Sequence, residues 1–434
     1  MELIGENNTM DVAQYIAEAG GLVEKWSDTL LSEDAPKIRD SYRLAETARM
    51  LERQHIANRE FAQNNSMLLA EDAANTVTAN VARWDPVLVS MVRRAAPVLL
   101  SFDFGSVQTM SMPTGLVFSL SAHYTDGSGA EALFDEANTA FSGTGTHAGD
   151  DPFLPAFSTG RGMPTSAAEG DISATMSFVI DKISVEAKSR QLAGSYSIEV
   201  QQDMRAVHNL DADTELANIM SMELLAEQNR EFARTLWIVS RLGAQNTGTP
   251  GVFDVDSDAD GRWSVEKNKG IAYQIAKEAT QIYFATRRGL GNKVLATADV
   301  ITALYMAGVL DTGGTNPLAA EMGGMDPAMS SYVGRLLGRY DVHLDPYLTN
   351  VHGVLVGYRG VIPWDAGLYW CPYTPFELHR AIDPKSFVPK LGYKTRYGIV
   401  SNPWVRVSDG GPRDGMTLTA RRNDYFRSFR VTGI

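Results

Sequence analysis

The most metal-like pattern in the chain is a run of alternating carboxylates that ends in a glycine: Asp254, Asp256, Asp258, Asp260 and Gly261. Such spacing resembles the start of an EF-hand calcium loop, which also requires a glutamate at its twelfth position. Counted from Asp256, that position is Lys267, and Glu266 comes one residue early. Pro250-Gly251 would also interrupt the entering helix. We interpret the run as a solvated acidic turn, and a calcium-binding hydrolase is kept as a remote alternative.

No other residue pattern predicts catalysis. The seven histidines form no HExxH or i,i+4 metal pair, and no GxSxG, GxxxxGK[ST] or GxGxxG motif occurs. The single cysteine, Cys371, lies in the aromatic run Tyr369-Trp370-Cys371-Pro372-Tyr373, which favours a buried core thiol. We therefore predict a chain that is not an enzyme, with no catalytic residue, no cofactor and no metal.

One tripeptide is unevenly distributed along the chain. Leu/Ile-x-Glu occurs once in residues 72–434, at Leu225-Ala226-Glu227, and six times in residues 1–71, ending at Glu6, Glu18, Glu24, Glu33, Glu46 and Glu71. Acidic amphipathic helices also generate such triplets by chance. The last copy, Leu69-Ala70-Glu71 before Asp72, falls where a helical pattern gives way to small polar residues. A processing protease needs exposed, extended chain of that kind, so we predict cleavage here.

The longest regular pattern lies in residues 180–243. Ile183, Val185 and Ala187 alternate, then Tyr196, Ile198 and Val200, which predicts strands, with Gly194 at a bend or hairpin turn between them. From Asp211 the apolar spacing becomes three and four residues, which predicts one helix of about thirty residues ending at Gly243. Two i,i+3 ion pairs are expected along it, Glu227–Arg230 and Glu231–Arg234.

The flanking regions differ in character. Residues 1–63 predict helices, the last of which opens at Pro36 and has only a narrow apolar stripe that needs a partner. Residues 64–82 predict an exposed, flexible link. Residues 123–176, rich in Gly, Ser, Thr and Ala, predict either an excursion onto a neighbouring subunit or surface disorder. Further helices are expected at 269–288 and 298–308, and strands at 294–296, 340–344, 353–358 and 367–373. The fold class is α+β.

Composition excludes several classes of protein. The 434 residues carry a net charge of −13, which argues against a non-specific nucleic-acid binder, because such proteins are normally basic. Residues 1–71 alone hold 13 acidic and 7 basic residues. No apolar run reaches eighteen residues, so no membrane-spanning helix is predicted, and the first residues lack the pattern of a signal peptide.

Taken together, nearly all of residues 85–434 resembles the major head proteins of T-even-type tailed bacteriophages. No single motif is catalytic, but many occur in one order. The resemblance is carried by Met91-Val92-Arg93-Arg94, Met112-Pro113-Thr114-Gly115, Glu186-Ala187-Lys188-Ser189-Arg190-Gln191-Leu192, Gln202-Asp203-Met204-Arg205-Ala206-Val207-His208, Asp211-Ala212-Asp213, Asp365-Ala366-Gly367, Lys394-Thr395-Arg396-Tyr397-Gly398, Tyr425-Phe426-Arg427 and Gly433-Ile434.

The resemblance implies the HK97-type capsid fold and a division of the chain. The expected parts are a cleaved helical propeptide (1–71), an N-terminal arm (72–107), an extended loop with a shortened insertion (108–176), a peripheral domain with a long spine helix (177–262), an axial domain (263–400) and a C-terminal return to the peripheral domain (401–434). It also implies that a prohead protease cuts after Glu71, within the site Leu69, Ala70, Glu71 and Asp72.

The implied function is a major capsid protein that assembles as hexamers into the head shell around phage double-stranded DNA. Its implied partners are further copies of itself, vertex and portal proteins, an internal scaffold core, the prohead protease and decoration proteins, with no specific nucleic-acid recognition and no membrane. The implied location is the virion shell, assembled in the bacterial cytoplasm. The alternative within the family is the paralogous vertex protein, which forms pentamers.

Overall fold

The computed structural model describes 20–30, 41–69, 99–126, 129–132, 136–149, 151–169, 172, 174–208, 210–259, 261, 263–311, 332–360, 365–382, 388–402 and 418–434. The chain divides into two compact units. Of the described residues, one unit holds those within Leu116–Ile183, and the other holds those before Leu116 and from Ser184 to Ile434. Mixed helices and sheets confirm the predicted α+β class.

The smaller unit is built on a three-stranded sheet with the order β3-β2-β4. Its elements are β2 (Thr114–Tyr124), β3 (Glu131–Ala132), a short helix α6 (Thr165–Ala168) and β4 (Met176–Glu186). Between β3 and α6, isolated antiparallel bridges join Thr144 to Arg161 and Ala148 to Ser158. The excursion predicted at 123–176 is therefore partly paired with itself.

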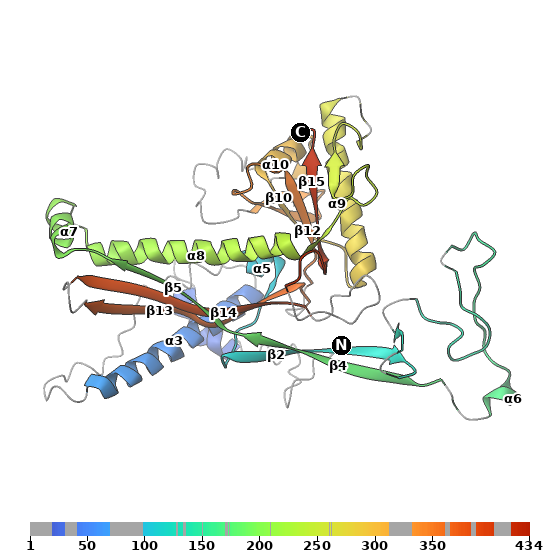
Figure 1. Ribbon diagram of the computed structural model, residues 1–434, viewed down its shortest axis with the longest axis horizontal. Helices are drawn as coiled ribbons and strands as arrows, with labels where there is room; N and C mark the ends of the chain where they lie inside the picture. The colour runs from blue at the N-terminus through green and yellow to red at the C-terminus, as the bar shows by residue number, and fades with distance from the viewer. Residues whose placement is uncertain are drawn as a thin grey trace. The chain divides into compact units, whose positions relative to one another are not determined.

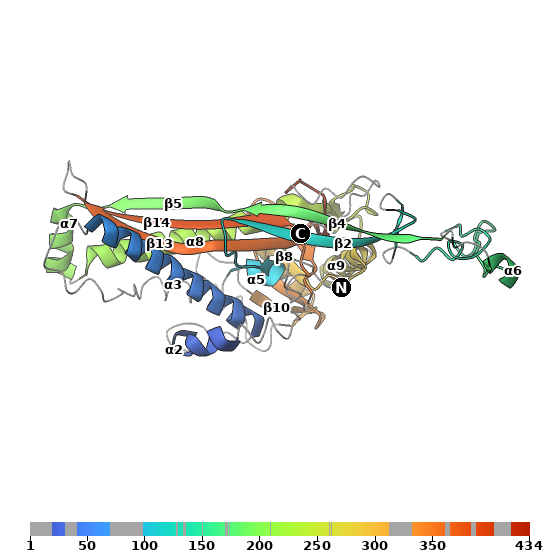
Figure 2. The same ribbon diagram turned by 90° about the horizontal axis from the view of Figure 1, so that it is seen from below.

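The first sheet of the larger unit has the order β1-β13-β14-β5. Its strands are β1 (Ser106–Val107), β13 (Leu368–Ile382), β14 (Pro389–Ser401) and β5 (Lys188–Ser195). Two long helices pack on it, α8 (Ala212–Val239) and α3 (Ser41–Leu69). Both views show α3 running along the β13 side of this sheet (Figures 1 and 2). Short helices α2 (Ser27–Leu30) and α5 (Ser101–Phe104) complete this part of the core.

The second sheet has the order β6-β15-β12-β8-β11-β10-β9, and β7 also pairs with β15. Helices α9 (Ser264–Thr286) and α10 (Ala298–Met306) supply much of its apolar core. The strands are β6 (Ser240–Leu242), β7 (Val252–Asp254), β8 (Lys293–Ala296), β9 (Leu310–Asp311), β10 (Tyr332–Leu336), β11 (Tyr340–Leu344), β12 (Gly353–Gly357) and β15 (Asn423–Thr432).

Strand pairing cuts across the expected boundary at residue 400. Strands β13 and β14, from the stretch expected to be axial, share a sheet with β5, and the C-terminal strand β15 lies between β6 and β12. The reason is that strands far apart in sequence pair where their apolar faces match, which sequence order does not reveal. The division into arm, loop, peripheral and axial parts stays a prediction.

Several predicted elements differ at their ends. The strand predicted through Ile198 and Val200 is wrong, because these residues begin a short helix, α7 (Ile198–Asp203), which continues as a π-helix, η1 (Met204–His208). Gly194 lies inside β5 and pairs with Leu391, so it is not a hairpin turn. The long helix ends at Val239 rather than Gly243, because Ser240 already starts β6 and pairs with Asn423.

Candidate assembly surfaces and the helix that covers one of them

The predicted cleavage triplet begins at the end of a helix. Leu69 is the last residue of α3, and Ala70, Glu71 and Asp72 lie outside the described residues. The flexible link predicted from residue 64 is wrong for residues 64–69, which continue α3. A helix adds residues more easily than it starts, so a stable earlier part can carry weak helix formers such as Asn64-Asn65-Ser66. Local composition therefore placed the helix end too early.

The partner that the narrow stripe of α3 was expected to need is the sheet of β1 and β13, together with α5. Ala48 and Leu51 are fully buried in one core cluster with Phe232 of α8 and Phe376 of β13. The buried face is wider than predicted, because it also holds polar side chains. Three of these have no exposed surface: Glu46, Thr47 and Gln54. Buried polar groups of this kind are hydrogen-bonded as a rule.

Gln54 binds the backbone of a single residue through both ends of its amide. The Phe376 N–H donates to Gln54 Oε1 at 2.9 Å, and Gln54 Nε2 donates to the Phe376 carbonyl oxygen. Phe376 lies in a bulge of β13, where the pairing register with β14 shifts between Thr374 and Glu377. A bulge takes backbone groups out of the ladder. Gln54 supplies a partner for each of the two Phe376 backbone groups.

Tyr42 does the same for Val107, the last residue of β1. Its hydroxyl donates to the Val107 carbonyl oxygen at 2.7 Å, and the Val107 N–H donates to that hydroxyl at 3.1 Å. Arg43, next on α3, forms an ion pair with Asp103 of α5. The pKa of Tyr42 is raised, first by burial and then by the nearby Glu46 carboxylate, so the hydroxyl stays protonated and able to donate.

Helix α8 is tied to its surroundings by ion pairs between elements, rather than by the two pairs predicted along the helix. Arg190 of β5 donates to Glu227 at 2.7 Å and to Glu231 at 2.6 Å. Arg230 donates to Asp345 at 2.6 Å, and the Asp345 side chain is 2% exposed. Of these pairs, the one at Asp345 is the more buried, and the Arg190 pairs are about one-third exposed.

The alternating carboxylates behave as the acidic turn that was predicted. Asp254 accepts from the backbone N–H of Asp256 at 3.2 Å, and Asp258 accepts from the N–H of Asp254 at 3.0 Å. Lys267, at the position where a calcium loop needs a glutamate, pairs with Asp256 at 2.7 Å. Asp260 lies outside the described residues. Within the described ranges, no group of three His, Cys, Asp or Glu side chains is arranged to hold a metal ion.

Cys371 is a buried thiol, as its aromatic neighbours predicted. Its side chain lies in β13 and is 3% exposed. Burial, with a smaller contribution from the Glu46 carboxylate, raises the pKa of the thiol to about 12. Since only the thiolate is an effective nucleophile, this environment suppresses reactivity.

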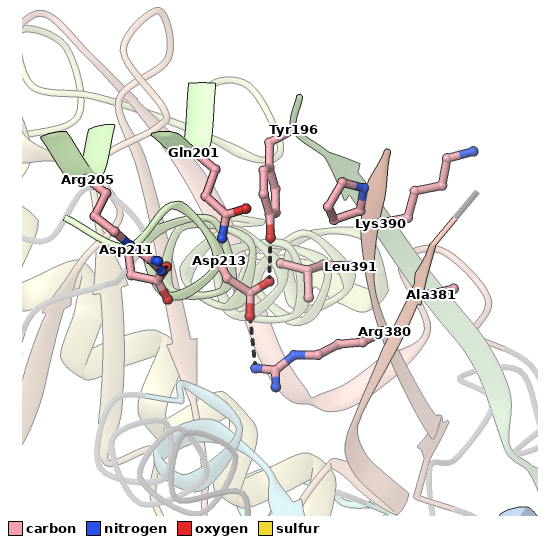
Figure 3. A pocket seen from close by; sticks show the side chains of 10 residues that line it. Tyr196, Gln201, Arg205, Asp211, Asp213, Arg380, Ala381, Lys390 and Leu391 are labelled. Atoms are coloured by element: carbon pink, nitrogen blue, oxygen red, sulfur yellow. Dashed lines mark hydrogen bonds and ion pairs between the residues drawn. The ribbon is translucent and has the colours of Figure 1, made fainter. Parts of the chain in front are cut away.

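A pocket of about 650 Å³ lies where α7 and the start of α8 meet β13 and β14 (Figure 3). Arg205 pairs with Asp211 at 3.0 Å, while Arg380 lies 3.3 Å from Asp213. Tyr196 donates to Asp213 at 3.2 Å, and burial and that carboxylate raise the pKa of Tyr196. The Arg380–Asp213 pair therefore joins the start of α8 to β13.

The smaller unit exposes large apolar side chains. Phe153 is 94% and Phe178 is 71% exposed. On β4, Met176, Phe178 and Ile180 are all exposed and alternate along the strand, which places them on one face. Exposed apolar groups gathered in this way mark interaction surfaces. The packing of this excursion on another subunit stays a prediction.

The sequence comparisons match the chain to one protein family. A family model described as "Major capsid protein Gp23" matches residues 81–431. The chain belongs to the Gp23 major capsid protein family. The major capsid protein of Salmonella phage ViI is 36% identical to this Gp23-family chain over 394 residues, covering 84% of this chain and 89% of that protein. That of Enterobacteria phage T4 is 32% identical over 95% of this chain and 98% of that protein.

Two further comparisons concern a vertex protein and a solved capsid structure. The capsid vertex protein of phage T4 is similar over only 55% of this chain, at 22% identity, so the major capsid assignment is favoured over the vertex alternative. A structural match to a chain from the capsid of Myoviridae phage XM1 covers 77% of this chain and 92% of the XM1 chain, with 11% identity and a TM-score of 0.40. The assignment rests on the sequence comparisons.

Tyr42 and Gln54 are the residues that sequence reasoning missed. A signal for Gln54 existed, because it follows Met50 by four positions and Leu51 by three and so lies on the apolar stripe. A polar residue in that place predicts a buried hydrogen bond. Its partner, Phe376, lies 322 positions away along the chain, and no sequence pattern indicates that its backbone needs a hydrogen bond from a side chain.

Proposed function

We propose that this protein forms the hexamers of a tailed-phage head shell around double-stranded DNA, and that removal of residues 1–71 matures it. The family membership supports the shell role, and the exposed apolar face on β4 supports contact between copies. The role is structural rather than catalytic. The proposed partners are vertex and portal proteins, a scaffold core, a prohead protease and decoration proteins, with assembly in the host cytoplasm. No described helix is long and apolar enough to cross a bilayer.

The observation that supports the cleavage site best is that Leu-Ala-Glu occurs three times in different settings. Leu44-Ala45-Glu46 lies inside α3, where Ala45 and Glu46 are buried. Leu225-Ala226-Glu227 lies inside α8, where Leu225 is buried. Only Leu69-Ala70-Glu71 falls at the end of a helix. A protease binds extended chain, so the third copy needs the least unfolding to be cut.

The test is the intact mass of protein taken from purified particles, together with a variant. The expected mass is that of Asp72–Ile434, and Glu71→Ala should keep the full-length mass. Glu46→Gln is the control, because it alters the matching triplet inside α3 and should leave the mass of the product unchanged. Full-length protein in mature, DNA-filled particles of the unaltered chain would refute the processing proposal while leaving the shell role in place.

A further inference from the structure

Helix α3 occupies positions that a β-strand would otherwise take. Strand β1 is the outer strand of its sheet and pairs with β13 through Val107 and Trp370. The bond from Gln108 N–H to the Trp370 carbonyl oxygen, at 2.9 Å, lies on the β13 side. The N–H and C=O of Val107 both bind Tyr42 instead. The outer edge of β1 is thus capped by one hydroxyl group.

The same edge continues along β13. From Glu377 to Ile382 this strand pairs with β14 on one side, and no described strand pairs with its other side. At Phe376 the backbone groups meet Gln54 of α3. Tyr42 and Gln54 stand twelve positions apart on one helix, a separation of about 18 Å. Two backbone residues along one sheet edge therefore each have both of their hydrogen-bonding groups satisfied by a single α3 side chain.

We propose that the outer edge of β1 and β13 is a docking surface for an extended segment of a second copy of this chain, and that α3 covers it until the propeptide is removed. The inference rests on the proposed removal of residues 1–71. Loss of α3 takes away the hydrogen-bonding partners of the Val107 and Phe376 backbone groups. An edge left bare in this way is a template for pairing.

A second copy is the occupant that the chain itself favours. Strand pairing uses backbone groups and demands little of sequence, so any extended segment with an unpaired edge can dock. The chain carries such a segment in β4, which is 11 residues long and the outer strand of the order β3-β2-β4. Residues 376–382 offer an edge of about 23 Å, enough to pair with most of a strand of that length. In a shell, neighbouring copies of the chain also hold the β13 edge of one copy and the β4 edge of another at a high local concentration.

Hydrogen exchange of backbone amides tests whether the edge is paired after processing. The samples are the full-length unassembled chain, shells of the uncleaved Glu71→Ala variant and processed shells, and the peptides read are those covering 106–110 and 376–382. We expect protection at Val107 and Phe376 in all three, because docked strands replace Tyr42 and Gln54. Exchange at least about tenfold faster in processed shells than in the uncleaved ones would show an open edge and overturn the proposal.

A cross-linking experiment identifies the occupant. Arg380→Cys places a thiol on the exposed part of β13, and the native Cys371 is buried and does not compete. Shells assembled from equal amounts of ¹⁴N and ¹⁵N chains are processed and then labelled at this thiol with a photo-reactive group. Cross-linked peptide pairs of mixed isotope are expected. Pairs of a single isotope only would mean that the edge closes within its own chain, which refutes docking of a second copy.

Opening the edge early gives a third measurement on the full-length protein. Tyr42→Phe with Gln54→Leu removes the two caps but keeps side chains of similar size. Thr47→Val is the matched control, because it removes only a local bond to the Arg43 carbonyl oxygen. The double variant should associate at a concentration about tenfold lower than the control. Equal association of the two refutes a capping role for α3, whereas failure of the unaltered chain to assemble at all would refute the proposed function instead.

Discussion

The hydrogen bonds of Gln54 predict a large effect from a change that is almost isosteric. In Gln54→Leu the side chain keeps its approximate volume, so the apolar packing of α3 on β13 is largely preserved. The N–H and C=O of Phe376 lose their partners, however, and both are buried beneath α3. No described strand pairs with the outer side of β13 at this point, so the sheet does not replace those partners.

The magnitude follows from the cost of burying unpaired polar groups. Each such group costs about 1–3 kcal/mol, and two are left unpaired. Leucine avoids the burial cost of the glutamine amide itself, so the net loss in local stability is about 2–4 kcal/mol. Because 1.4 kcal/mol corresponds to tenfold, the Phe376 amide should exchange its hydrogen about 30-fold to 1,000-fold faster.

The assay is hydrogen exchange of the unassembled full-length chain, read at peptides covering 374–378, together with urea denaturation. Thr47→Val again provides the control, because Thr47 is equally buried but bonds only within α3. We expect that control to lose no more than about 1 kcal/mol. If Gln54→Leu and Thr47→Val change exchange at Phe376 to the same extent, the two-ended amide contact is not what holds the bulge.

Three other perturbations have defined outcomes. Arg190→Met removes both ion pairs to the α8 carboxylates; since the side chain is one-third exposed, it should cost only about 1 kcal/mol in urea denaturation. Gly367→Ala places a Cβ 2.5 Å from Tyr425 Cβ and should cost about 1–3 kcal/mol, whereas Gly162→Ala, with open space around it, should be near neutral in the same assay. His343 is fully buried and desolvation lowers its pKa below the ordinary value of 6.5, so its neutral form favours the folded chain above pH 6.5 and stability falls as pH drops below it. Melting temperatures between pH 7.5 and 5.5 should show this fall, and His343→Phe should make it smaller; an unchanged slope would refute the assignment.

Local patterns determined the elements whose cores are formed by neighbours in sequence. The period of three and four residues located α8, and the ranges expected for two further helices and three short strands coincide with α9, α10, β8, β11 and β12. These predictions were correct because the apolar face of each element is formed by residues within that element. The acidic turn at Asp254–Asp258 could also be judged locally, since Lys267 stands where a calcium ligand would be needed.

Elements whose state depends on distant partners were predicted less well. Ile198 and Val200 alternate like strand residues, but Ser197 caps a helix there by accepting from the Val200 N–H at 3.3 Å. The end of α8 was misplaced for a related reason. Where a helix stops is decided by what the next residues can pair with, and Ser240 pairs with Asn423 from the far end of the chain.

By itself, the sequence determined the α+β class, the long helix, the absence of a recognisable catalytic motif and, through its resemblance, the capsid family. Only the tertiary structure decided that β13 and β14 lie beside β5, and that α3 seals the edge of their sheet through Tyr42 and Gln54. The physical reason is that every residue has the same backbone carbonyl group and nearly every residue has a backbone N–H, so the residue type does not show which backbone group accepts or donates a hydrogen bond. Phe376 and Val107 carry apolar side chains, so nothing in their residue types reveals that their amides and carbonyls need a partner.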